Sequence, residues 1–135
     1  MQSLAVAVVG IPFVGAVACL AVRDKAAKYV AVATSVLTAA AAIALSVGMP
    51  RVNALYGGQP WLGPSASKGV CGYQLDPLAI LMMLASTVLG VAITIYSMGY
   101  LSPGNREHPT HSGQARYYFW LMLFVGSMVG IALSP

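Results

Sequence analysis

A short segment between two apolar stretches contains the densest group of side chains that could bind a metal. Glu107, His108 and His111 lie within five residues of one another. An acid and two imidazoles are suitable ligands, but Pro109 prevents a regular helix that would align them, and no fourth ligand is close. The sequence therefore predicts a solvated loop here, with no metal site.

A single carboxylate, Asp76, stands directly before Pro77 at the start of a long apolar stretch. Asp at a helix N-cap accepts free backbone N–H groups, and Pro is well tolerated at the next position. The negative charge also suits the positive end of the helix dipole. A proton-carrying acid would have to lie deeper and pair with another ionisable group. We therefore predict that Asp76 and Pro77 form a helix cap, and we assign no catalytic residue.

The elements that position these residues follow from the composition. The 135 residues are 59% hydrophobic and only 7% charged, whereas about 25% of the residues in a soluble domain are charged. Because a helix needs about 20 apolar residues to span the hydrocarbon, we predict an all-α membrane protein. It forms one bundle of four transmembrane helices. The predicted helices are 3–22, 29–48, 77–101 and 117–133, with an outer loop at 49–76 and an inner loop at 102–116.

The distribution of Lys and Arg predicts the orientation of the bundle. Five of these residues fall in the loops that join the first helix to the second and the third to the fourth. Arg51 and Lys68 lie on the opposite side, with both termini. Cytoplasmic loops carry the excess of positive charge, so both termini are predicted to face outward. Cys19 and Cys71 then lie on opposite sides of the membrane and should not form a disulfide.

The fourth segment contains a motif that favours close helix packing. Gly126 and Gly130 have GxxxG spacing, with Ser127 beside them. Small residues let helices approach closely in lipid, where packing drives association. We predict that these residues pack within the bundle and also against other membrane subunits.

Aromatic and basic residues at the ends of the apolar segments are typical of anchors at the membrane surface. The predicted interface anchors are Trp61, Tyr73, Arg116, Tyr117 and Trp120.

The four apolar segments share one property: none contains Asp, Glu, Lys, Arg or His. Ion carriers place such groups at membrane depth in spite of their cost. The chain alone is therefore predicted not to pump ions, and it is predicted to bind no cofactor and no nucleic acid.

Two stretches, YQLDPLAILMMLASTVLGVAITIYSMGYL and ARYYFWLMLFVGSMVGIALSP, resemble the third and fourth helices of antiporter-like membrane subunits. Such subunits occur in respiratory complex I, where the subunit-five type is most similar, in multisubunit sodium/proton antiporters and in membrane-bound hydrogenases. The similarity extends to the Gly- and Trp-bearing loop before Leu75.

The resemblance implies only the N-terminal four-helix portion of such a subunit. The family's proton path uses a glutamate on the fifth helix and lysines on later ones, and no position of this chain matches them. We therefore expect a truncated or split subunit that acts as a structural and assembly part of a larger ion-translocating complex, driven by redox chemistry or a gradient. The expected partners are the lipid bilayer and other membrane subunits, including a chain with the remaining antiporter helices and the charged path. The expected location is a bacterial or archaeal cytoplasmic membrane.

Two alternatives stay open at this point. The chain could be an independent, self-associating membrane protein or an assembly factor. It could also be a quinone-contacting subunit of a membrane oxidoreductase, an idea suggested by the consecutive aromatic residues 117–120. As a part of an ion-translocating oxidoreductase or antiporter complex, the chain itself is expected to be a non-catalytic subunit.

Overall fold

The computed structural model describes residues 2–48, 59–60, 72–73, 77–102, 104–105 and 112–134. Within them lie four helices, α1 (Gln2–Ala21), α2 (Asp24–Val47), α3 (Pro77–Tyr100) and α4 (Gln114–Ala132). Each is long and apolar enough to cross a membrane. The predicted all-α class with four transmembrane helices is confirmed, and the chain is an integral membrane protein.

Two short strands supplement the helices. Strand β1 (Gln59–Pro60) pairs antiparallel with β2 (Gly72–Tyr73), so that Gln59 is opposite Tyr73 and Pro60 is opposite Gly72. The sequence analysis assigned these residues to the outer loop at 49–76, since two-residue strands leave no periodic pattern to detect.

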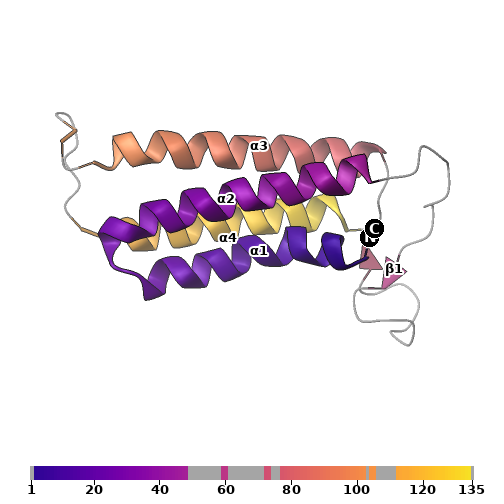
Figure 1. Cartoon of the computed structure of the whole chain (residues 1–135), viewed down its shortest axis with the longest axis horizontal. Helices are drawn as coiled ribbons and strands as arrows, with labels where there is room; N and C mark the ends of the chain where they lie inside the picture. Colours follow the sequence, from indigo (N-terminus) through magenta and orange to yellow (C-terminus); the bar gives the residue numbers. More distant parts are fainter. Residues whose placement is uncertain are drawn as a thin grey trace.

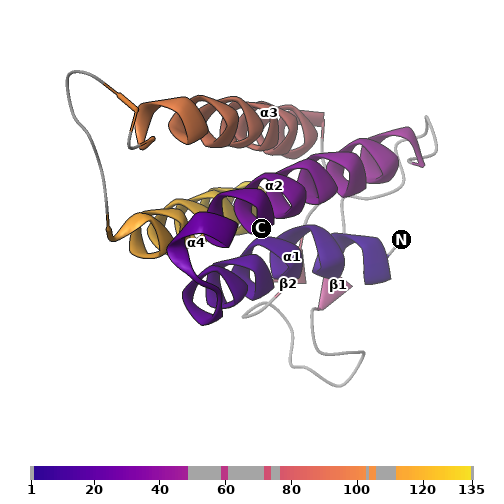
Figure 2. The same ribbon diagram turned by 60° about the vertical axis from the view of Figure 1, so that its left-hand side comes forward.

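Helices α2 and α4 occupy the middle of the bundle, and each contacts all three other helices. Helices α1 and α3 lie on opposite sides of this pair (Figure 1; the turned view in Figure 2 shows the same order). The start of α1 and the end of α4 lie at one end of the bundle, near β1, and the α1–α2 connection lies at the other. Both termini are therefore on the same side of the bundle. Which side of the membrane this is stays a prediction.

Two helices begin three or more residues earlier than expected. Helix α2 begins at Asp24 instead of residue 29, and α4 begins at Gln114 instead of residue 117. The carbonyl oxygen of Arg23, in extended conformation, accepts hydrogen bonds from the amides of Ala26 and Ala27, which starts α2. An acid in the first turn of a helix is favoured by the dipole. The charged residues were assigned to loops because they are polar, but they fit the first turns of helices that emerge from the membrane.

Small residues bring the helices close together. A Cβ built on Gly15 of α1 would collide with the Thr34 side chain of α2, and one on Gly90 of α3 would lie 3.0 Å from a methyl group of Val125 of α4. In lipid, this close backbone approach supplies the packing energy that holds helices together.

Five buried hydroxyls of α2 and α3 each bond to the backbone of their own helix. The hydroxyls of Thr38, Thr87, Thr94 and Ser97 donate to the carbonyl oxygen four residues earlier, and that of Ser35 to the carbonyl three residues earlier. Because lipid offers no partners, polar groups must be satisfied inside the protein. These hydroxyls therefore fit a membrane-embedded core without adding a charge to it.

Candidate functional site

Every Asp, Glu, Lys, Arg and His in the described ranges lies at one end of the bundle, which we call the charged end. These residues are Arg23, Asp24, Lys25, Lys28 and Arg116. Arg23 precedes α2 and the other four lie within the first five residues of α2 or α4. The remaining length of the four helices carries no Asp, Glu, Lys, Arg or His. The bundle can therefore organise charge at its surface but holds none at membrane depth.

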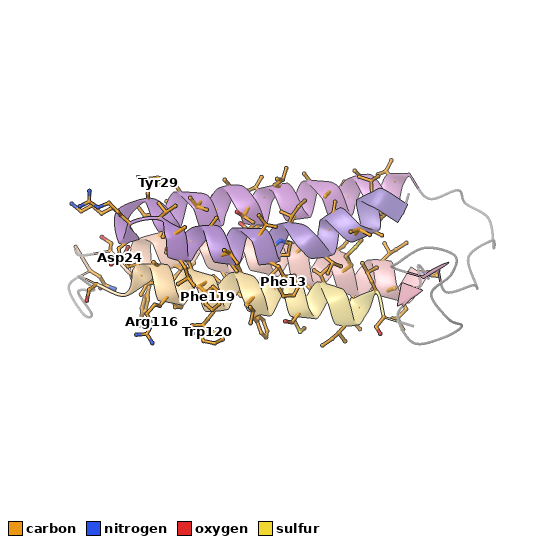
Figure 3. The ribbon with its side chains drawn as sticks, turned by 90° about the horizontal axis from the view of Figure 1, so that it is seen from below. Phe13, Asp24, Tyr29, Arg116, Phe119 and Trp120 are labelled. Atoms are coloured by element: carbon orange, nitrogen blue, oxygen red, sulfur yellow. The ribbon has the colours of Figure 1, made fainter. Side chains whose placement is uncertain are left out.

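Asp24 of α2 binds the start of α4. Its Oδ1 accepts a hydrogen bond of 2.9 Å from the amide of Ala115, and its Oδ2 accepts one of 3.3 Å from the amide of Gly113. Gly113, the N-cap of α4, supplies no side chain to do this, and its φ of +84° is a left-handed conformation that favours glycine. A carboxylate on one helix thus caps another helix (Figure 3).

Two further hydrogen bonds join α3 to α4 at the same end. The Nε2 group of Gln114 donates to the carbonyl oxygen of Leu101 over 2.7 Å. The hydroxyls of Ser97 and Tyr117 are 2.8 Å apart. Together with the Asp24 contacts, these bonds form what we call the charged-end network. It fixes α2, α3 and α4 relative to one another where the chain leaves the membrane.

Sequence reasoning missed the role of Asp24, which was counted only as a loop charge. One signal was present: the segment before α4, Ser112-Gly113-Gln114, places glycine at the N-cap, where Ser, Thr, Asp or Asn is preferred. A helix start without a side-chain cap of its own leaves its first amides to water or to an acceptor from elsewhere in the chain.

The predicted helix cap is described only in part. Pro77 is the first residue of α3, and its side chain is exposed. Asp76 lies outside the described residues, so its N-cap role stays a prediction.

The predicted packing residues of α4 occupy three different environments. Gly126 is buried, and a Cβ there would lie 3.1 Å from the ring of Phe13 of α1. A Cβ on Gly130 would make an ordinary 3.9 Å contact with Val9. Ser127 is exposed, and its hydroxyl donates to the carbonyl oxygen of Leu123. The GxxxG motif therefore faces α1, while Ser127 lies on the outer face of the bundle, where lipid or another subunit would contact it.

The predicted anchors whose side chains the structure describes lie at the charged end. Arg116 and Trp120 point away from the bundle on the same side of α4 (Figure 3), and the Trp120 ring is 61% exposed. Tyr117 is partly exposed, at 39%, and also takes part in the charged-end network. Trp61 and the side chain of Tyr73 lie outside the described residues.

Three tyrosines that the sequence analysis did not name extend this group to the other helices. Tyr29, Tyr96 and Tyr100 are exposed and lie within the first or last two turns of α2 and α3 at the charged end. The Tyr96 and Tyr100 rings stack at 5.8 Å, and the Lys28 ammonium lies 5.0 Å from the centre of the Tyr29 ring. We call Tyr29, Tyr96, Tyr100, Tyr117 and Trp120 the aromatic belt. Such rings prefer the headgroup level, so we expect the membrane surface to cross the bundle at this belt, and the anchoring role of its rings stays a prediction.

The consecutive aromatic residues do not converge on one site. Tyr118 is buried between the helices, Phe119 is half-buried, and Tyr117 and Trp120 are exposed. Successive residues of a helix point in different directions, so these rings are distributed around α4. The quinone-contact alternative gains no support from their arrangement.

The residues considered for metal binding in the sequence analysis are not described by the structure. Glu107, His108 and His111 lie outside the described residues, as does Cys71. In the described ranges, no three His, Cys, Asp or Glu side chains gather in a group that could hold a metal ion. Cys19 is buried, with a free thiol.

Part of the chain is similar in sequence to known proteins. Residues 61–118 match the family described as NADH-ubiquinone oxidoreductase (complex I), chain 5 N-terminus. The NAD(P)H-quinone oxidoreductase subunit 5 of Anthoceros angustus chloroplasts is 38% identical over 64 residues, which cover 47% of this chain and 8% of that subunit. The corresponding subunit of Chaetosphaeridium globosum is 34% identical over 76 residues, 56% of this chain and 10% of the relative. No solved structure matches the chain.

These matches confirm the resemblance expected from the sequence. The matched part spans at most about a tenth of the length of these two relatives.

Proposed function

We propose that this chain, which carries the N-terminal portion of an antiporter-like subunit of the complex I subunit-five type, is a structural part of a membrane ion-translocating oxidoreductase complex. Its role is to pack against neighbouring subunits and to support their ion path. The charged groups of that path are supplied by partner chains. The proposal rests on the similarity of residues 61–118 to the complex I chain 5 family, and from it we infer a role within the whole complex.

The observation that carries the proposal is the location of the ionisable side chains. All those in the described helices lie at the charged end, and none lies at membrane depth. A proton carrier needs an exchangeable group inside the membrane. The buried hydroxyls of α2 and α3 cannot fill this role, because they are bonded to their own backbones and do not ionise near neutral pH.

The exterior of the bundle supports the assembly role. Large apolar side chains are exposed along all four helices, including Val14 of α1, Val36 of α2, Leu81 of α3 and Ile131 of α4. A surface of this kind can contact lipid on some faces and other transmembrane helices on others. The proposed partners include a chain with the remaining antiporter helices.

The decisive experiment isolates the intact assembly in a mild detergent through a tag on this chain, and identifies every co-purifying protein. The proposal expects other membrane subunits, among them one with acidic and basic residues inside its helices. Isolation of this chain only as a homo-oligomer would contradict it and favour the independent, self-associating alternative.

A second measurement addresses transport directly. The chain alone, reconstituted in sealed vesicles, should pass protons and sodium no faster than empty lipid. Faster flux would overturn the proposal, because the described helices contain no group able to carry it.

The relatives' names assign those proteins to chloroplasts. The expected bacterial or archaeal cytoplasmic membrane gains no support from them, and the membrane that houses this chain stays a prediction.

A further inference from the structure

A hollow at the charged end combines basic and apolar walls. It lies where the connection between α1 and α2 approaches the first turn of α4. It has a volume of about 700 Å³, and its lining residues are Leu20, Val22, Arg23, Asp24, Lys25 and Ala115. This volume is within the range of roughly 300–1,000 Å³ that is usual for small-molecule sites.

The lining of the hollow has a net positive charge, from two cations and one acid. Arg23 and Lys25 are exposed, and neither side chain forms an ion pair with a residue that the structure describes. The one acid in the lining, Asp24, directs its two oxygens to the amides of Ala115 and Gly113. Because the carboxylate is engaged by the start of α4, both cations are available for an anion from outside.

The position of the hollow specifies what kind of anion fits. Leu20, in the last turn of α1, is 50% exposed and forms an apolar wall. The aromatic belt, including Tyr29 and Tyr117 on the adjacent turns of α2 and α4, marks the headgroup level at the same end. A ligand with an acidic head and an apolar tail satisfies both walls at this depth.

We propose that this hollow binds an anionic phospholipid. Arg23 and Lys25 contact the phosphate oxygens, and the first part of an acyl chain lies along Leu20 and Val22. Arg favours phosphate through its planar fork of donors, and Lys acts as a point charge. A free phosphate ion offers the same acidic oxygens, but it would leave the apolar wall without a contact.

The test uses the purified chain in detergent micelles and measures retained lipid by native mass spectrometry. Phosphatidylglycerol is compared with phosphatidylcholine of identical acyl chains, and glycerol phosphate serves as the soluble headgroup. The proposal expects retention of phosphatidylglycerol in preference to phosphatidylcholine. Glycerol phosphate should not compete at matched concentration. Competition as strong as that of the lipid itself would assign the hollow to a free phosphate and overturn the lipid assignment.

Two double variants separate a specific site from general attraction of acidic lipid. Arg23→Gln with Lys25→Gln removes both cations of the hollow. Lys28→Gln with Arg116→Gln removes two positive charges from the same end of the bundle, outside the lining. Each cation near an anionic headgroup contributes about fivefold to its affinity. The first pair should therefore weaken binding about 25-fold, and the second pair much less.

Equal loss in the two double variants would overturn the proposal in favour of diffuse electrostatics. Arg23→Lys keeps the charge and should retain most of the binding. All variants should keep the elution volume of the parent protein, because the altered side chains are on the surface. A binding defect with unchanged elution is therefore attributable to the hollow.

Discussion

Replacement of Asp24 tests whether one carboxylate holds the start of a distant helix. Its 2.9 Å bond from the Ala115 amide is well formed, and its 3.3 Å bond from the Gly113 amide is weaker. Asp24→Asn retains one acceptor oxygen but removes the charge from the positive end of the α4 dipole. We expect it to lower the free energy of unfolding by about 1 kcal/mol. Asp24→Ala removes both acceptors, and we expect a loss of about 2–3 kcal/mol, since a hydrogen bond to a charged group contributes about 1.5–3 kcal/mol.

The effect should be local as well as global. A loss of about 1.4 kcal/mol in local stability raises the fraction of open amides about tenfold. Hydrogen exchange should therefore accelerate in the first turn of α4 in Asp24→Ala, while the middle of α4 changes little. The assay is hydrogen-exchange mass spectrometry of peptides that contain residues 113–118, combined with unfolding by sodium dodecyl sulfate titration in mixed micelles.

A matched control keeps the interpretation specific. Lys25→Gln also removes one charge from the adjacent position, but the Lys25 ammonium is a donor only and cannot accept a hydrogen bond from the amides of α4. It should change stability by less than about 0.5 kcal/mol. If Asp24→Ala exchanged at the parent rate in the first turn of α4 and unfolded at the same detergent fraction, the capping role of Asp24 would be refuted.

Three further substitutions probe the packing and the second helix start. Gly15→Ala should destabilise the chain by about 1–3 kcal/mol, because the new methyl group collides with α2; Gly10→Ala, which meets nothing within 4 Å, should be neutral or stabilising in the same unfolding titration. Gly126→Leu should push α4 away from α1 and reduce the yield of assembled complex, whereas Gly130→Ala should be tolerated. A normal yield of complex with Gly126→Leu would contradict the close packing of α4 against α1. Asp76→Asn should weaken folding or assembly by about 1 kcal/mol; intact assembly with loss of ion transport would instead identify Asp76 as a functional acid.

The number and approximate position of the helices could be predicted because hydropathy is a local property. Helix α3 was placed within one residue of its observed bounds, Pro77–Tyr100. The start of α2 was missed by five residues. A charged segment looks like a loop in a hydropathy profile, although Asp24 and Lys25 are well accommodated in the first turn of a helix that emerges from lipid.

The charged-end network could not be predicted in the same way. Asp24 and the amides that it binds are separated by 89 and 91 positions. Helix capping patterns cover only a few neighbouring residues, so the glycine at the N-cap of α4 indicates a missing side-chain cap but does not identify Asp24 as its replacement. It depends on the way in which α1 and α4 place the two helix starts side by side. The orientation of the GxxxG motif toward Phe13 likewise depends on the rotation of α4 about its axis.

The carboxylate that serves α4 is synthesised long before α4 itself. Since translation proceeds from the N-terminus, the hairpin of α1 and α2 can already be inserted, with Asp24 at the membrane surface, when Gly113 and Ala115 leave the ribosome. The Asp24 carboxylate is then already in position when α4 forms, and the amides of its first turn can donate hydrogen bonds to it. The contact between Asp24 and the start of α4 can therefore form only when the hairpin of α3 and α4 docks onto the hairpin of α1 and α2.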